Sequence, residues 1–376
     1  MKKKILFVTA TRADFGKLKS LIKITKQQKK FDVSIVVTGM HMLPNFGSTH
    51  EEIDKSFSAG VIKFKNQKFG DNLENVLTRT TKKFSEIVKK IKPHLIVVHG
   101  DRVESLACAL VASLNHILTA HIEGGELSGT IDDTIRHTIT KLSHVHFAGN
   151  QVAKRRITNM GERKESVFVI GSPDIDILLS KRLQNIAGVK KRYDIFFKDY
   201  AILLWHPVTS DIKNLKKNTI RLIKFINNFN INFVVIYSNN DPGTKIIINN
   251  YKKYLNKKKC KVFKSIRFES FITLLKHSRF IIGNSSAGIY EAPVLGVPVL
   301  NVGNRQHKRL KSSGIKNISI SKLTKNNVIN FLNNFKKEGK KYFGSGNTDK
   351  NFLKALNSKR FWNISTQKYF LDKTNI

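Results

Sequence analysis

Short runs of apolar residues alternate with longer amphipathic stretches along the whole chain. Runs that are apolar throughout are typical of parallel strands covered by helices on both faces. In the first half, the predicted strands are Ile5–Ala10, Asp32–Val37, His94–His99, Ile117–Ile122 and Val145–Ala148. In the second half, they are Ala201–Trp205, Phe233–Tyr237, Phe280–Ile282 and Val299–Val302.

Between these strands, apolar residues recur every three or four positions, which predicts amphipathic helices. The helices span Phe15–Lys29, Asn72–Ile91, Glu104–Asn115, Asp132–Ser143, Asn218–Asn228, Pro242–Leu255, Phe268–Lys276 and Ile289–Leu295. Because the alternation of strand and helix occurs twice, we expect an α/β fold with two doubly wound, Rossmann-like domains. We place the first domain at 1–172, the second at 173–349 and a C-terminal segment at 350–376.

The chain is strongly basic, with 67 Lys and Arg against 27 Asp and Glu in 376 residues, a formal charge of +40. A hydrophobic fraction of 40% is enough for two packed cores, which excludes a disordered basic tail. The basic residues are dispersed and carry no RNA-binding or zinc-finger signature. We therefore interpret them as a solvated surface that suits an anionic small substrate, without specific binding of nucleic acid.

Other broad classes are excluded by what the sequence lacks. Two cysteines, Cys108 and Cys260, form neither a disulfide scaffold nor a zinc site, which favours a reducing cytoplasm. No apolar run approaches the roughly 20 residues of a membrane helix. The absence of a Walker sequence and of GxGxxG argues against an NTPase and a Rossmann dehydrogenase. We expect a cytoplasmic protein with no membrane association, metal or cofactor.

Polar residues follow the predicted strands, and open α/β sheets bind ligands at the carboxyl ends of their strands. In the first half these segments are Thr11-Arg12-Ala13-Asp14, Gly100-Asp101-Arg102 and Glu123-Gly124-Gly125-Glu126. In the second half they are His206-Pro207, Gly283-Asn284-Ser285-Ser286 and Gly303-Asn304-Arg305. We therefore expect a site in a cleft between the domains.

Residues 101–133 form an acidic island, with six acids and one base, Arg102: the acids are Asp101, Glu104, Glu123, Glu126, Asp132 and Asp133. Grouped carboxylates raise one another's pKa, which makes acid and base roles available near neutral pH. Site roles are predicted for Asp101, Glu123 and Asp132, although Arg136 could neutralise Asp132. Asp133 has capping-box spacing from Thr130, and we expect Glu104 and Glu126 to be solvated. A divalent metal on these acids is an alternative, but no recognised ligand spacing supports it.

The Gly283–Gly288 segment predicts an anion site at the start of a helix. Ser285 and Ser286 supply hydroxyls for a phosphate, and Glu291 lies where a carboxylate could take a ribose diol. The alternative is ordinary helix capping by either serine. His206 at a strand end, with Arg12, Lys17 and Arg305, completes the set of candidate phosphate partners.

Taken together, these residues resemble the hydrolysing UDP-N-acetylglucosamine 2-epimerases of the sialic and legionaminic acid pathways. The resemblance spans some 300 residues and runs through Thr11–Phe15, Val98–Arg102, His121–Glu126, Ser128–Asp133 with Ile135–His137, Gly283–Ser286 and Gly303–Gln306. The strings His-Ile-Glu-Gly-Gly-Glu and Gly-Thr-Ile-Asp-Asp are the specific ones. Non-hydrolysing relatives carry Glu-Ala-Gly in place of Glu-Gly-Gly, which favours the hydrolysing branch.

The resemblance implies a glycosyltransferase-B-like architecture in which a C-terminal helix crosses back to the first domain. The family's catalytic groups fall on Asp101, Glu123, Asp132 and His206. Its substrate contacts fall on Arg12, Lys17, His41, Arg102, Ser285, Ser286, Glu291 and Arg305. The implied reaction is loss of UDP from C1 with removal of the C2 proton, followed by hydration of the glucal to the free manno sugar. The family also tends to self-associate, so a homo-oligomer is expected.

Three alternatives stay open. A glycosyltransferase of the same fold would use the serine cradle but leave the three carboxylates without a purpose. A non-hydrolysing 2-epimerase would keep the nucleotide on the product. A polyanion-binding protein would explain the charge but not the acidic island. The nucleotide-sugar substrate itself is left open between UDP-N-acetylglucosamine and 2,4-diacetamido-6-deoxy analogues carrying UDP or GDP.

Overall fold

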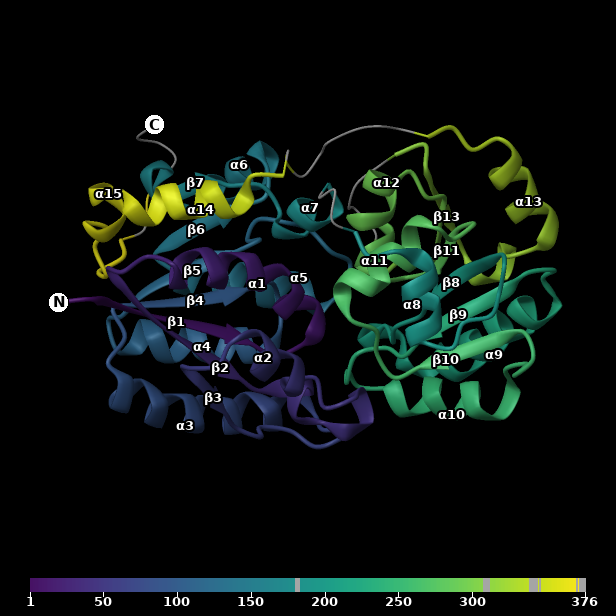
Figure 1. Cartoon of the computed structure of the whole chain (residues 1–376), viewed down its shortest axis with the longest axis horizontal. Helices are drawn as coiled ribbons and strands as arrows, with labels where there is room; N and C mark the ends of the chain where they lie inside the picture. The colour runs from purple at the N-terminus through teal and green to yellow at the C-terminus, as the bar shows by residue number, and fades with distance from the viewer. Residues whose placement is uncertain (180–182, 307–311, 338–343, 345, 370, 372–376) are drawn as a thin grey trace. The chain divides into compact units, whose positions relative to one another are not determined.

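A computed structural model describes residues 1–179, 183–306, 312–337, 344, 346–369 and 371, and its chain divides into two compact units (Figure 1). The first unit comprises Met1–Glu126, Asp132–Leu179 and Tyr342–Ile376, and the second comprises Leu127–Ile131 and Ser180–Lys341. The short segment Leu127–Ile131 thus belongs to the second unit although both of its neighbours belong to the first. Apart from this segment, the chain passes from the first unit to the second at residue 180 and returns after residue 341, whereas the expected boundaries were 172 and 349.

The first unit is built on a seven-stranded parallel sheet with the order β3-β2-β1-β4-β5-β6-β7. Its strands are β1 (Lys3–Thr9), β2 (Phe31–Val37), β3 (Val61–Lys63), β4 (Leu95–His99), β5 (Leu118–Ile122), β6 (Val145–Ala148) and β7 (Val167–Val169). Its α-helices are α1 (Arg12–Lys26), α2 (His50–Ser56), α3 (Leu73–Ile91), α4 (Val103–Leu114), α5 (Ile131–Leu142), α6 (Gln151–Asn159), α7 (Pro173–Leu178), α14 (Thr348–Asn357) and α15 (Lys359–Trp362). Short 3₁₀ turns lie at Gly39–Met42, Pro44–Phe46 and Lys164–Ser166.

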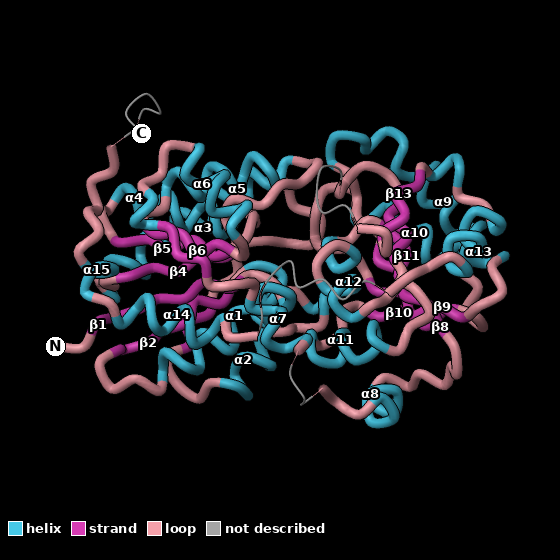
Figure 2. Tube along the Cα trace, turned by 90° about the horizontal axis from the view of Figure 1, so that it is seen from above, coloured by secondary structure: helices cyan, strands magenta, loops and turns pink. Residues whose placement is uncertain are grey.

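Helices cover both faces of this sheet, which is why its central strands are apolar throughout (Figure 2). One face packs on α3, α4 and α5 through a core that includes Phe84, Cys108 and Ile139. The opposite face packs on α1 and α14 through a core that includes Phe15 and Phe352. The first unit therefore has two apolar layers, one on each side of its sheet.

The C-terminal helices complete the second of these layers. Phe352 of α14 is fully buried, with ring centroids 4.7 Å from Phe147 and 6.2 Å from Phe7. Phe361 of α15 stacks on Phe147 at 6.0 Å. Residues at the end of the described chain thus pack against strands formed near its beginning (Figure 1).

The second unit repeats the scheme with a six-stranded parallel sheet of order β10-β9-β8-β11-β12-β13. Its strands are β8 (Tyr200–Leu204), β9 (Asn232–Ile236), β10 (Cys260–Phe263), β11 (Ile281–Gly283), β12 (Val299–Val302) and β13 (Ile315–Ile318). Its α-helices are α8 (Ile186–Arg192), α9 (Ile212–Asn228), α10 (Thr244–Tyr254), α11 (Phe268–Lys276), α12 (Glu291–Leu295) and α13 (Lys325–Asn333), with 3₁₀ turns η4 (Thr209–Asp211), η5 (Ser286–Gly288) and η6 (Ile320–Lys322).

The predicted α/β class with two doubly wound sheets is confirmed. Several predicted helices were wrong at their start. The helix α9 begins at Ile212 rather than Asn218, and Ile289–Leu295 is reduced to α12, which begins at Glu291 and is preceded by the turn η5. None of the described helices has the length and apolar character needed to cross a bilayer.

Candidate active site

The carboxyl ends of the neighbouring strands β4 and β5 bring His99 and Glu123 together. His99 ends β4 and pairs in register with Ile122, the residue before Glu123. The backbone of Glu123 then turns into the left-handed region at φ 61°, which is uncommon for a residue other than glycine. This turn directs the carboxylate to His99, whose Nε2 lies 3.1 Å from Oε2.

Two further groups from α1 and α7 close around Glu123. Lys17 Nζ lies 2.9 Å from Glu123 Oε2 and 3.0 Å from Asp174 Oδ2, so one ammonium serves two carboxylates. The Ser172 hydroxyl contacts both Glu123 Oε1 and Asp174 Oδ1. We call Lys17, His99, Glu123, Ser172 and Asp174 the Glu123 cluster; all five belong to the first unit.

The electrostatics of the Glu123 cluster correct one prediction. Burial by itself raises the pKa of Glu123, but Lys17 and His99, together with the Ser172 hydrogen bond, outweigh burial and hold this pKa well below its usual value. The expectation that neighbouring acids raise its pKa was wrong, because Lys17 and His99 contact the carboxylate directly. Glu123 is therefore ionised at neutral pH.

Lys17, predicted as a phosphate contact, lies against two carboxylates of the Glu123 cluster instead. The site in the first unit thus contains residues that sequence reasoning missed. His99 was part of a quoted motif but had no role, and Ser172 and Asp174 fell in a stretch interpreted as a domain joint. The available signal was the Ser172-Pro173-Asp174 string, because Pro173 opens α7 and Asp174 occupies its first turn.

Asp101 and Asp132 lie on segments held by Arg136 and His121. Arg136, whose side chain is 3% exposed, contacts Asp101 and also donates to the Glu126 carbonyl at 3.1 Å. It lies 3.5 Å from Asp133, so the cation expected to neutralise Asp132 pairs with Asp101 and Asp133. Asp132 is partly buried in the first turn of α5.

His121 fixes the backbone directly before Asp101. Its Nε2–H donates to the Gly100 carbonyl at 2.7 Å, and its Nδ1 lies 3.1 Å from Thr140 Oγ1 on α5. Burial lowers the pKa of His121 to about 3, so the ring is neutral at physiological pH. A neutral ring thereby links the loop of Asp101 to the helix of Asp132.

Two other residues predicted for the site, Arg12 and Arg102, lie next to buried glutamates of the first unit. Arg12 Nε is 3.3 Å from Glu52, and Arg102 Nε is 3.6 Å from Glu104. Glu104, expected to be solvated, is fully buried and accepts a hydrogen bond from Gln67 at 2.8 Å, so that prediction was wrong. Glu126 is partly buried and accepts from Asn150 at 3.0 Å.

His41, predicted as a substrate contact, lies wholly in the interior. Its side chain has no exposed surface, and its two ring nitrogens lie 3.0 Å from Thr9 Oγ1 and 2.6 Å from Thr49 Oγ1. Burial lowers its pKa to about 4. These two contacts fasten the loop after β2 to Thr9 and Thr49.

In the second unit, Asn284 organises the ends of β8 and β11. Its Oδ1 accepts from the His206 backbone N–H at 2.7 Å, and its Nδ2 donates to the His206 carbonyl at 2.9 Å. Gly283, at φ 137°, makes this approach possible because an added Cβ would lie 1.8 Å from the Leu204 carbonyl oxygen. Asn284 belongs to the Gly283-Asn284-Ser285-Ser286 motif, but no role was predicted for it from the sequence.

Around Asn284 lie the residues of the predicted cradle. Its carbonyl accepts from Arg305 Nη1 at 3.3 Å and from Gln306 Nε2 at 2.9 Å. Ser285 is the N-cap of η5, and its Oγ accepts from the Ala287 N–H at 3.3 Å. Ser286 is partly exposed, whereas Glu291 is the first residue of α12 and is buried.

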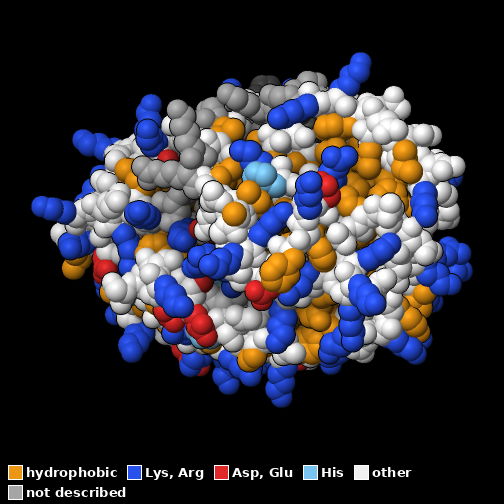
Figure 3. All heavy atoms as spheres, turned by 45° about the vertical axis from the view of Figure 1, so that its right-hand side comes forward, with side chains coloured by type: hydrophobic (Ala, Val, Ile, Leu, Met, Phe, Trp, Pro, Cys, Tyr) orange, Lys and Arg blue, Asp and Glu red, His pale blue; other side chains and the backbone are white. Residues whose placement is uncertain are grey.

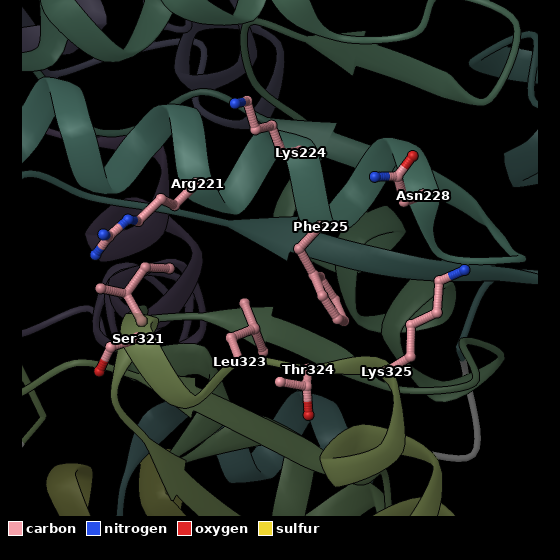
Figure 4. A pocket seen from close by; sticks show the side chains of 9 residues that line it. Arg221, Lys224, Phe225, Asn228, Ser321, Leu323, Thr324 and Lys325 are labelled. Atoms are coloured by element: carbon pink, nitrogen blue, oxygen red, sulfur yellow. The ribbon is translucent and has the colours of Figure 1, made fainter.

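The described surface of the second unit is rich in basic side chains (Figure 3), and one of its cavities has a basic and apolar lining. Lys and Arg side chains are scattered over the visible face in Figure 3. One cavity between α9 and the segment at η6 is lined by Arg221, Lys224 and Lys325 around Phe225 (Figure 4). No carboxylate or histidine lines it. Within the described residues, no three His, Cys, Asp or Glu side chains are grouped to hold a metal ion.

The dispersed charge gives a first testable expectation. Binding to random duplex DNA should be weak and should largely vanish at about 0.2 M salt, because the affinity comes from released counterions. A filter-binding titration at several salt concentrations measures it. Nanomolar binding that survives such salt would favour the polyanion-binding alternative.

Comparison with known proteins adds the following. The model of the UDP-N-acetylglucosamine 2-epimerase family matches residues 23–363. A UDP-N-acetylglucosamine 2-epimerase of Neisseria meningitidis is 40% identical, over 98% of this chain and 99% of the relative. A hydrolysing UDP-N,N'-diacetylbacillosamine 2-epimerase of Legionella pneumophila is 32% identical, over 85% of this chain and 86% of the relative.

Among solved structures, the Methanocaldococcus jannaschii UDP-GlcNAc 2-epimerase in complex with UDP-GlcNAc and UDP has a TM-score of 0.80 at 22% identity. The match covers 95% of this chain and 99% of that structure. The fold class is thus the glycosyltransferase-B-like fold, with two α/β units.

Proposed function

Because the chain belongs to the UDP-N-acetylglucosamine 2-epimerase family, we propose that it is a hydrolysing member. It converts UDP-N-acetylglucosamine, or a 2,4-diacetamido-6-deoxy analogue, to the free manno-configured sugar and UDP. Relatives named as hydrolysing match at 32% and 33% identity over 85% and 86% of the chain.

The observation that carries this proposal is the Glu123-Gly124-Gly125 string. A Cβ added to Gly124 would lie 2.8 Å from His121 Nδ1 and 2.9 Å from Thr140 Oγ1, both of them buried. The alanine of the Glu-Ala-Gly string therefore has no room here unless the ring that holds Gly100 moves. Packing around the catalytic carboxylate supports the hydrolysing pattern.

The first unit supplies the chemistry. The C2–H of the sugar is barely acidic, so departure of UDP comes first or nearly so and builds oxocarbenium charge at C1. Ionised Glu123, with Asp101 and Asp132, stabilises that charge and exchanges the C2 proton. Water then adds at C1, and a proton returns to C2 from the opposite face.

The second unit holds the leaving group. Ser286, Ser285 and Arg305 lie on segments fastened to Asn284, beside His206. Hydroxyls and a guanidinium stabilise a pyrophosphate, and buried Glu291 is our candidate for the ribose. Arg12 and Arg102 remain proposed phosphate or sugar contacts, each oriented by a buried glutamate.

A test of the cradle replaces Ser285 and Ser286 by Ala together. UDP binding should weaken, because each lost hydrogen bond to a charged group is worth about 1.5–3 kcal/mol. Isothermal titration calorimetry measures the change. Ser321→Ala, in the cavity of Figure 4, is the control and should bind UDP like the unmodified chain. Unchanged affinity in the double variant would mean that the serines only cap a turn.

The function itself is tested by incubation with a panel of nucleotide sugars, followed by proton NMR. We expect free manno-configured sugar and UDP from at least one of them, without an added acceptor. A product that keeps its nucleotide would indicate a non-hydrolysing epimerase. A requirement for an acceptor would indicate a transferase.

A further inference from the structure

Helix α5 carries three of the contacts that arrange the proposed catalytic carboxylates. Asp132 lies in its first turn, and Arg136 contacts Asp101. Thr140 lies in its last turn, and its Oγ1 is 3.1 Å from Nδ1 of His121, the ring that fixes the backbone directly before Asp101. The position of α5 therefore determines where Asp101 and Asp132 lie.

The C-terminal end of α5 is capped by a residue near the end of the described chain. The last carbonyls of a helix lack partners within the helix, and a lysine side chain can satisfy them. The ammonium of Lys368 donates here to the carbonyls of Ser143 at 2.6 Å, Lys141 at 2.7 Å and Thr140 at 3.4 Å. Its positive charge also stabilises the negative end of the helix dipole.

A buried carboxylate holds the same ammonium. Glu162 is 4% exposed; its Oε2 lies 2.7 Å from Lys368 Nζ, and its Oε1 lies 2.7 Å from Nζ of Lys141 on α5. His146 from β6 contacts Oε2 as well, at 3.0 Å. Burial would raise the pKa of Glu162, but His146 and the two lysines lower it to about 2. Glu162 is therefore an anion at neutral pH and keeps Lys368 at the end of α5.

The backbone beside Lys368 is fastened to the same region. We call residues 363–369 the C-terminal strap; they form neither helix nor strand. The Thr366 carbonyl lies 3.0 Å from Nε2 of His144, two residues after the end of α5. Nδ1 of that ring accepts the Thr119 N–H at 3.1 Å, so Nε2 carries the proton and donates to the strap. The strap thus contacts the end of α5 through both its backbone and a side chain.

We propose that Lys368 is a positioning residue for the reaction: by capping α5 it holds Thr140 against His121 and so fixes the loop of Asp101. This inference rests on the proposed function. Without the ammonium, the last turn of α5 loses a partner for its carbonyls and frays. Thr140 then separates from His121, which releases the Gly100 carbonyl. Asp101 samples a wider range of positions, and a small misplacement of a catalytic group is costly to the rate.

The first test replaces Lys368 by Met, which keeps an apolar stem and removes the ammonium. We expect kcat to fall on the order of 10-fold or more, because Asp101 is less well placed. KM should change much less, because the proposed pyrophosphate and ribose contacts lie in the other unit. Steady-state kinetics of UDP release measures both constants. An unchanged kcat in Lys368→Met would overturn the proposal.

The ammonium can be rebuilt chemically, which separates its role from damage caused by the substitution. Cys108 and Cys260 are buried, whereas the Lys368 side chain is 26% exposed. Alkylation of Lys368→Cys with bromoethylamine should therefore fall on the new thiol and place an ammonium at nearly the same reach as lysine. Most of kcat should return, and the same treatment of the unmodified chain should change nothing. A modified variant that stays as slow as Lys368→Met would contradict the role of the charge.

Hydrogen–deuterium exchange of the unliganded chain follows the proposed route without any substrate. In Lys368→Met, exchange should become faster in peptides that cover 97–103 and 136–143. Trp362→Phe is the matched control, since it removes the 2.8 Å hydrogen bond from Nε1 to the Leu356 carbonyl in the same C-terminal region. It should lower Tm as well but leave exchange at 97–103 unchanged. Equal exchange at 97–103 in the two variants would overturn the route through His121.

Thr140→Val removes the hydroxyl that contacts His121 and leaves the C-terminal strap in place. Alone, it should make exchange faster at 97–103 but not at 363–369, which keeps the route testable even if Lys368→Met does not fold. Added to Thr140→Val, Lys368→Met should lower kcat much less than it does in the unmodified chain. Fully additive losses would overturn the route.

The two kinds of measurement separate this inference from the proposed function. Faster exchange at 97–103 in a chain that releases no free sugar from any nucleotide sugar would overturn the proposed function. The link between Lys368 and the loop of Asp101 would then still be supported.

Discussion

Conversion of Glu123 to Gln, or of Asp132 to Asn, is expected to lower kcat by about 10²–10⁴-fold. Each change keeps the size of the side chain but removes a proton acceptor and a negative charge near the developing cation. KM should change much less, because the proposed pyrophosphate and ribose contacts Ser285, Ser286, Arg305 and Glu291 lie in the other unit. Steady-state kinetics with UDP release as the readout measures both constants. Asp54→Asn, an exposed acid paired with Lys63, provides the control.

The same reaction in D2O shows whether these carboxylates act at C2. Deuterium should appear at C2 of a free sugar of manno configuration, because the acid that returns the proton exchanges with solvent. A gluco product that retains protium at C2 would mean simple hydrolysis or transfer. The assignment of Asp101, Glu123 and Asp132 would then be wrong.

The second large effect is on stability, which should fall steeply as the pH drops from 7 to 4. Burial lowers the pKa of His41 and His144 to about 4 and that of His121 to about 3, from 6.5. Between pH 6.5 and the native pKa, a histidine of the unfolded chain binds a proton that the same histidine in the native chain does not bind. A fall in pH through this range therefore favours unfolding. Each pKa unit corresponds to about 1.4 kcal/mol, so each histidine costs on the order of 3 kcal/mol by the time the pH has fallen to its native-state pKa.

A second loss follows at lower pH. Burial would raise the pKa of Glu162, but His146, Lys368 and Lys141 lower it to about 2. Its contribution is present above its ordinary pKa of 4.5 and disappears as the pH falls toward 2.

Thermal unfolding followed by circular dichroism at pH 7, 6 and 5 measures the histidine effect. His144→Gln should reduce the difference in Tm between pH 7 and pH 5, because it removes one of the titrating groups. His116→Asn replaces an exposed histidine at φ 52°, which Asn tolerates, and should leave the difference unchanged. An equal Tm at pH 7 and 5 in the unmodified protein would contradict the burial of these rings.

The strands that sequence analysis did not predict are β3, β7, β10 and β13. They are the edge strands of the two sheets. A central strand is covered on both faces, so its sequence is an unbroken apolar run. In β13 only the first and last residues are buried, and Lys316 and Asn317 between them are exposed. Edge strands are three or four residues long here and carry little of that signal. Their existence depends on a partner strand that a local pattern does not contain.

The sequence predicted candidate residues where polar groups follow a strand, and it did not predict the neighbours that the fold brings to them from distant parts of the chain. The position of Glu123 after β5 was predictable from the apolar run before it. The contact of Glu123 with Lys17 joins residues 106 positions apart, and no local pattern encodes such a distance. The wrong prediction for the pKa of Glu123 has the same origin. The acidic island contains one base in the sequence, but the fold places a second base, Lys17, against Glu123.

The place of α14 in the first unit sets the order in which the two units can complete their folding during synthesis on the ribosome. Strands β1 to β7 leave the ribosome early, yet one apolar face of their sheet is closed by Phe352 and Phe361. The second unit lies between them in the sequence, and its sheet is complete by Ile318. That sheet can therefore form while the first still exposes apolar surface to chaperones. The part of the molecule that is translated first is finished last.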